Sequence, residues 1–125
     1  MQLTFKEKLP NLVSGIINKI SMDVDYEIKE VGNDIEIFGK FIVIREIKNE
    51  NRITEIKDCI PIEITIAKKY LIKKTKEVSL RLEGFHFEFE EDITVISGEI
   101  ELSNVEETED KYEEFEFIIE ETINS

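Results

Sequence analysis

Apolar residues alternate with polar or small ones in two stretches of the chain, residues 22–29 and 60–67. A third stretch, residues 35–44, starts with the same alternation and then carries apolar residues at both parities. A period of two places successive side chains on opposite faces of a sheet. The first two stretches therefore predict half-buried strands, and the C-terminal half of the third predicts a central strand that is covered on both faces.

Short polar links separate these stretches. Gly32-Asn33 suits a two-residue hairpin with positive φ, and residues 48–51 and 90–92 are further polar turns. Links this short predict antiparallel neighbours.

The parity of the apolar positions changes across Glu83 and Gly84, and again after Val95. One extra residue in a strand is what a β-bulge adds, and glycine tolerates the backbone geometry that one bulge type needs. The sequence therefore predicts two bent strands, as in a small sandwich or barrel.

Residues 34–41 faintly repeat in residues 92–100, and each copy places a glycine, Gly39 or Gly98, in mid-strand. Such a glycine marks a bend or a close backbone approach. The repeat predicts two related hairpins that face each other, with coincidence in an isoleucine-rich chain as the alternative.

Composition supports a β protein, because 22 of the 125 residues are isoleucine and only one is alanine. We expect a single all-β domain over residues 1–125: an antiparallel β sandwich or partly open barrel with about seven to nine strands. One short helix remains open for residues 68–76, where a charged edge is the alternative. Residues 111–125 fit strand and helix patterns equally.

The formal net charge of −13 limits the classes of binding partner that we expect. Residues 101–125 alone hold ten acids and one base. So acidic a chain is not expected to bind nucleic acid through phosphates, whereas a basic partner or simple solubility fits. No apolar run is long enough for a membrane helix and the first residues do not form a secretory signal, so we expect no membrane insertion and a cytoplasmic location. The acidic segment at about residues 106–125 is the clearest local bias.

Catalytic and metal-binding patterns are absent from the sequence. The single histidine, His86, is expected on a strand surface, and the single cysteine, Cys59, is expected to be a buried inert thiol rather than half of a thiol–imidazole pair. Acid clusters at the turns match no calcium-binding loop and are expected to be solvated. The chain is predicted not to be an enzyme and to hold no cofactor or metal.

Two segments are candidate protein-binding sites. The first is a basic patch that could contact an acidic surface or protect a sheet edge, formed by Lys68, Lys69, Lys73, Lys74 and Lys76. The second is the C-terminal segment, with Glu113, Phe115 and Phe117 as its candidate residues. Its alternating apolar face must be buried, so it is expected to pack back on its own sheet, with strand addition to a neighbouring molecule as the alternative. A homo-oligomer is therefore left open.

Three blocks of sequence carry a resemblance to a known family: residues 17–39, with the string Glu30-Val31-Gly32-Asn33-Asp34; the strand from Ile60 to Ile66; and the aromatic hairpin from Val78 to Leu102. Over residues 15–105 the chain resembles the N-terminal β domain of the stage VI sporulation protein D family, whose members help assemble the coat around the bacterial forespore. Those proteins are long and end in a LysM module, which is not found in this sequence.

The resemblance implies a structural protein on the mother-cell side of the spore coat that binds coat morphogenetic proteins. A non-enzymatic assembly module of this kind is the first functional hypothesis. The alternative is an acidic inhibitor or nucleic-acid mimic, of phage type, that occupies a basic surface of a host protein. A small-molecule carrier in a barrel mouth is the third.

Overall fold

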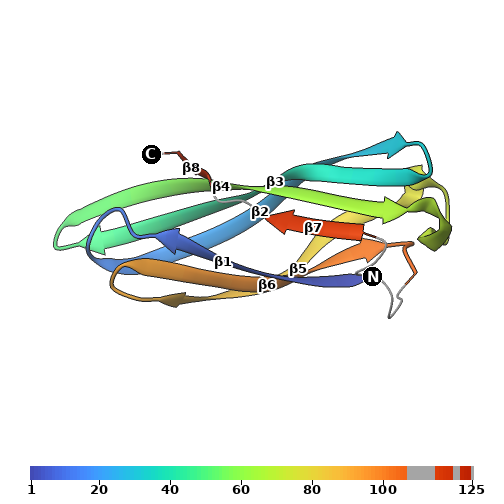
Figure 1. Ribbon diagram of the computed structural model, residues 1–125. Helices are drawn as coiled ribbons and strands as arrows, with labels where there is room; N and C mark the ends of the chain where they lie inside the picture. Colours follow the sequence, from blue (N-terminus) through green and yellow to red (C-terminus); the bar gives the residue numbers. More distant parts are fainter. Residues whose placement is uncertain (107–114, 120–121, 125) are drawn as a thin grey trace.

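The computed structural model describes residues 1–106 in full, together with the backbone of residues 115–119 and 122–124 (Figure 1). The described elements follow in chain order: β1 (Gln2–Pro10), β2 (Ile16–Val31), β3 (Asp34–Asn49), β4 (Arg52–Ala67), the 3₁₀ helices η1 (Lys68–Tyr70) and η2 (Thr75–Glu77), β5 (Ser79–Phe89), β6 (Ile93–Ser103), β7 (Phe115–Ile119) and β8 (Thr122–Asn124). Among these described elements, no helix is long and apolar enough to cross a membrane.

The strands form two antiparallel sheets that pack face to face in an elongated molecule (Figure 1). A three-stranded sheet has the order β1-β6-β5, and a five-stranded sheet has the order β2-β3-β4-β7 with β8 also pairing with β4. Buried side chains from both sheets make one apolar core. The predicted all-β antiparallel sandwich is confirmed.

The core lies between the sheets because the alternating apolar sets face inward. Ile35, Ile37 and Phe41 of β3 are fully buried, and the Phe41 ring centre lies 4.7 Å from that of Phe5 on β1. This ring contact ties the central strand of one sheet to an outer strand of the other. Burial of such side chains supplies most of the driving force for folding.

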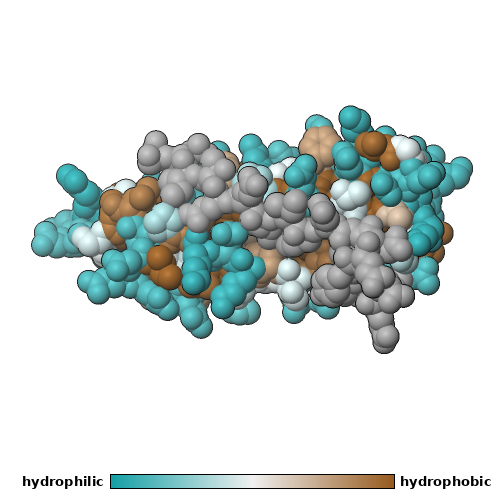
Figure 2. Space-filling model, viewed as in Figure 1, coloured by the Kyte–Doolittle hydropathy of each residue, from teal (hydrophilic) through white to brown (hydrophobic). Residues whose placement is uncertain are grey.

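For the C-terminal half of the 35–44 stretch, the predicted central position is confirmed and the predicted cover on both faces is wrong. β3 is central within its sheet, but Ile42 and Ile44 on its outward face are partly exposed. Isoleucine suits the extended backbone even where it is not buried, which explains apolar residues on that face. Among the residues that Figure 2 colours by hydropathy, hydrophilic ones form much of the visible surface of the molecule and apolar ones show between them.

The turns and one of the two bulges follow the prediction. Gly32 has φ 59° in the two-residue turn that pairs Val31 with Asp34. The β5–β6 pairing shifts register between Leu82 and Gly84, as the parity change there predicts. No such shift occurs after Val95, since β6 keeps one register against β1 through its length. Val95 lies on the opposite side of the strand from buried Thr94 and Ile96, so it adds an apolar residue without a bulge.

The two copies of the faint repeat are the central strands of the two sheets, β3 and β6. Both glycines allow a close approach. A Cβ at Gly39 would overlap the carbonyl oxygen of Asp25, and a Cβ at Gly98 would overlap that of Gly84 and lie 2.7 Å from the Phe5 ring. The expected close backbone contacts are thus present at both positions.

The C-terminal segment forms strands rather than a helix. β7 pairs antiparallel with Ile62–Ile66 of β4, and β8 pairs with Lys57–Cys59. The segment therefore packs on the chain's own sheet, which is the expected alternative, rather than on a neighbouring molecule.

Candidate functional site

The predicted lysine patch lies in the link that carries the chain from β4 in one sheet to β5 in the other. This link folds into η1 and η2 rather than an extended edge. Its backbone is anchored at its start, middle and end: the Lys68 amide donates to the Asn33 carbonyl at 2.8 Å, the Ile72 amide donates to the Asn104 carbonyl at 2.9 Å, and the Asn104 side-chain amide donates to the Glu77 carbonyl at 2.6 Å. The lysines are thus displayed on a well-anchored loop at one end of the sandwich.

A hollow of about 480 Å³ opens at this loop, and we call it the lysine hollow. It is lined by Glu30, Lys68, Leu71, Lys73, Lys74, Thr75 and Lys76. Four of the five predicted lysines therefore converge on one concavity. Lys69 does not line it; its Nζ lies 5.3 Å from the centre of the Tyr70 ring.

One acidic side chain belongs to the lysine hollow. Glu30 at the end of β2 accepts a hydrogen bond from Lys68 at 3.4 Å. A hydrogen bond from Thr75 and the nearby Lys68 ammonium hold the pKa of Glu30 below its usual value. Lys73 and Lys74 make no ion pair with any residue that the structure describes. The hollow therefore presents uncompensated positive charge within a strongly acidic chain.

Residues 106 and 115 of the acidic segment both lie beside this lysine loop. Val105 forms a bridge with Leu71, and the Glu106 amide donates to the Tyr70 carbonyl at 2.7 Å. At the other end, Phe115 pairs with Ile66, two residues before Lys68. Glu113 lies outside the described residues, and Phe115 and Phe117 are placed by backbone alone.

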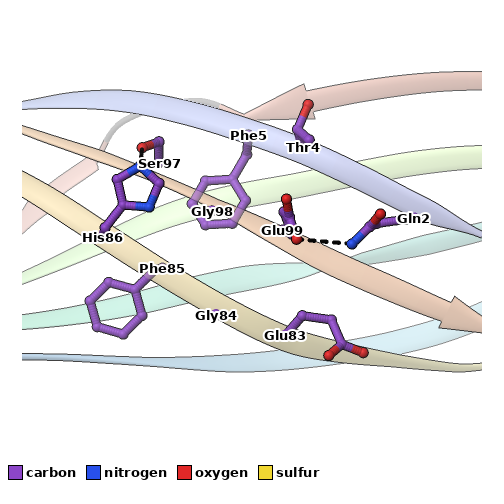
Figure 3. A pocket seen from close by; sticks show the side chains of 10 residues that line it. All are labelled: Gln2, Thr4, Phe5, Glu83, Gly84, Phe85, His86, Ser97, Gly98 and Glu99. Atoms are coloured by element: carbon purple, nitrogen blue, oxygen red, sulfur yellow. Dashed lines mark hydrogen bonds between the residues drawn. The ribbon is translucent and has the colours of Figure 1, made fainter.

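A second depression lies on the three-stranded sheet (Figure 3). It has a volume of about 580 Å³ and includes the backbone of Gly84 and Gly98. His86 Nε2 lies 2.8 Å from the Ser97 hydroxyl there, and the Gln2 amide donates to Glu99 at 2.9 Å. These groups satisfy one another in pairs, and they resemble an ordinary polar sheet face more than a reacting centre.

The single histidine and cysteine are not brought together. His86 is exposed on β5 of one sheet, as predicted, whereas Cys59 lies on the outward face of β4 in the other sheet. The thiol is partly exposed, so the expectation that it is buried is wrong. Its position in β4 is one residue from core-facing Ile60, and the alternation turns it outward. In the described part of the chain, no three His, Cys, Asp or Glu residues group as metal ligands.

An unpredicted polar cluster lies inside the sandwich. Arg45 and Asp58 are fully buried, and Arg45 Nη2 donates to Asp58 Oδ2 at 2.8 Å and to the Pro10 carbonyl at 3.0 Å. Arg45 Nη1 also donates to Asn11 at 2.9 Å and to Thr94 at 3.2 Å. The cluster joins both sheets and the link after β1. We interpret it as a structural anchor.

The signal for this cluster was present in the alternation. Arg45 continues the inward parity of Phe41 and Val43, and Asp58 continues that of Ile60. Charges of opposite sign at core-facing positions of neighbouring strands indicate a buried ion pair.

Comparison with models of known protein families, with curated proteins and with solved structures finds no match to this chain. The resemblance to the stage VI sporulation protein D family stays an expectation. Functional inference therefore rests on the geometry of the described residues.

The arrangement of acids on β2 bears on the alternative of a nucleic-acid mimic. Asp23, Asp25 and Glu27 occupy successive outward positions, but Lys29 follows them and Lys40 pairs with Asp25 across the sheet. This short row is therefore interrupted by positive charge. The mimic remains an untested alternative.

Proposed function

We propose that the chain is a non-enzymatic protein-binding module that acts in assembly, and that its lysine hollow receives an acidic segment of a protein partner. The observation that carries the proposal is the convergence of Lys68, Lys73, Lys74 and Lys76 on one hollow. The chain as a whole has a net charge of −13, so this local positive field stands out and suits an acidic ligand.

The geometry supports a protein ligand more than a small molecule. The hollow is open, and its cations lie on flexible side chains around an anchored backbone. Lysine acts as a point charge without the rigid fork of arginine, so it tolerates carboxylates in several orientations. Such a surface selects an acidic peptide by charge and sets the rate of encounter more than the affinity.

The finer version of the proposal comes from the sequence resemblance. In that version the partners are coat morphogenetic proteins, and the module acts on the mother-cell side of the developing spore coat. Expression timing in the native host tests it: expression confined to sporulation supports the spore version, whereas constitutive expression in a host that does not sporulate removes it.

Partner recovery from the native host at low salt tests the general version. The bait is the full chain, compared with a variant in which Lys68, Lys73, Lys74 and Lys76 are changed to Gln. The matched control changes four exposed lysines elsewhere to Gln: Lys6, Lys8, Lys19 and Lys29. We expect acidic proteins to be recovered by the wild type and the control and lost by the hollow variant. Identical recovery by all three baits would refute the role of the hollow.

A further inference from the structure

β7 and β8 lie along the edge of β4 in a single register. Ile62 pairs with Ile119, and Cys59 pairs with Thr122, so the two paired stretches continue one antiparallel alignment. Pro61 of β4 lies between them and has no N–H to donate to a ladder. The described parts of the C-terminal segment, residues 115–119 and 122–124, thus pair with β4 on either side of Ile60 and Pro61.

The β4 edge itself is long and apolar. β4 spans Arg52–Ala67, and Ile60, Ile62 and Ile64 on its inward face are buried. Its other neighbour, β3, pairs along the whole strand from Arg52 to Ala67. Without β7 and β8 this edge would offer a ready template for another strand. It is therefore a strand-addition surface whose binding mode the chain's own segment displays.

Charge also favours the acidic C-terminal segment at the β4 edge, which lies beside the lysine hollow. The sequence between Glu106 and Phe115 holds five acids and one base. Both of its flanking residues are anchored beside the lysine loop, through Tyr70 and Ile66. A C-terminal segment that arrives at β4 from another molecule would bring its acids to the lysine hollow as well.

We propose that the C-terminal segment exchanges between copies, so that residues 115–124 of one molecule pair with β4 of a second copy. This rests on the proposed function and names its partner, a second copy of the chain. The contacts are the same within a molecule and between molecules, because the segment and the edge are identical. Each copy offers one segment and one edge, and a contact between different surfaces can continue from copy to copy.

Mass action sets when exchange occurs. Pairing within one molecule is favoured by an effective concentration of about the millimolar range for a short link. Exchange should therefore increase with protein concentration. It should also increase where other contacts already hold copies together.

The chain offers a direct test, because its single cysteine lies opposite a threonine of β8. Directly opposed residues of an antiparallel pair have Cα atoms about 4.5–5.5 Å apart, which a disulfide can bridge. Wild-type chain, which has Cys59, is mixed at high concentration with the variant Cys59→Ser/Thr122→Cys and is then mildly oxidised. Mass spectrometry measures the disulfide-linked peptide that joins Cys59 of one chain to the cysteine of the other.

The matched control is Cys59→Ser/Thr4→Cys, which places the new thiol at an exposed position of β1. We expect the hetero-disulfide of the Thr122 variant to exceed the control by about tenfold, and to rise with concentration, because exchange raises the local concentration of the two thiols. A yield equal to that of the control would overturn the proposal. The single variant Thr122→Cys, which retains Cys59, reports the pairing within one molecule. Failure of exchange alone would leave partner recovery through the lysine hollow intact, so the two proposals are tested separately.

Discussion

The guanidinium of Arg45 lies 2.8 Å from the carboxylate of Asp58, and neither side chain is exposed. Arg45 Nε and Asp58 Oδ1 have no hydrogen-bond partner within the described residues. A buried pair of this kind contributes little net stability, but removal of one partner leaves an uncompensated charge in the core. The pair therefore specifies how the two sheets meet more than it strengthens their packing.

Arg45→Met should destabilise the fold strongly. We expect a loss of about 3–5 kcal/mol in the free energy of unfolding, because Asp58 would remain buried without its cation. Urea unfolding measures it. Arg81→Met is the control, since Arg81 is exposed and paired with exposed Glu83, and should leave stability nearly unchanged. Equal effects of the two substitutions would contradict the anchoring role.

Asp58 should also make stability depend on pH. Burial raises the pKa of Asp58 above its usual value, and the Arg45 charge offsets only part of this effect. The folded chain then holds the proton more tightly than the unfolded chain, whose aspartate pKa is about 3.9. The stabilisation from that proton is present below the unfolded pKa and is lost as pH rises through the folded pKa.

The measurement is the free energy of unfolding of wild type minus that of Asp58→Asn, followed from acidic to neutral pH. Other groups cancel in this difference. We expect this difference in unfolding free energy to fall as pH rises from the unfolded pKa of Asp58 through its higher folded pKa. A difference that rises or stays flat would show that desolvation is not the dominant effect on Asp58.

Gly98→Ala should destabilise the sandwich, because the new methyl group would overlap the Gly84 carbonyl and press on the Phe5 ring. Overpacking of this kind costs about 1–3 kcal/mol. Gly84→Ala is the matched control, since no atom lies within 4 Å of a Cβ there. Thermal unfolding of both variants checks the account, which fails if Gly84→Ala is the more damaging change.

Deletion of residues 111–125 should lower the melting temperature and raise the mass in solution. It removes the backbone pairing along β4 and leaves that edge open to other molecules. Calorimetry and light scattering measure the two effects. An unchanged melting temperature with unchanged mass would show that β7 and β8 do not hold the edge.

Local patterning predicted parts of β2 to β6, the hairpin turns and the bulge at Gly84, because each depends on residues close in sequence; it did not predict β1. It also marked Gly39 and Gly98 as places of close approach. It failed for Ile42 and Ile44, where an apolar residue on a strand need not be buried. Val95 misled for a different reason: it is buried, and its apolar side chain broke the apparent parity without adding a residue to the strand.

Only part of the candidate site could be predicted from the sequence. The run from Lys68 to Lys76 showed a basic patch, but its convergence on a hollow depends on η1, η2 and the distant residue Glu30. The Arg45–Asp58 pair depends on the register between β3 and β4, which sets Asp58 opposite Val43 and so beside Arg45. The register between two strands is a long-range property, so it cannot be predicted from the residues of either strand alone.

The central claim is that copies of the chain assemble through the lysine hollow and the exchanged C-terminal segment. Its most direct test is self-association, measured by sedimentation over a range of protein concentration and salt. The account predicts association that grows with concentration and weakens as salt rises, because salt screens the attraction between the lysine hollow and the acidic segment. The variant with Lys68, Lys73, Lys74 and Lys76 changed to Gln should associate less than the control with Lys6, Lys8, Lys19 and Lys29 changed. A chain that stays monomeric at every concentration, or associates independently of salt and of the hollow lysines, would contradict it.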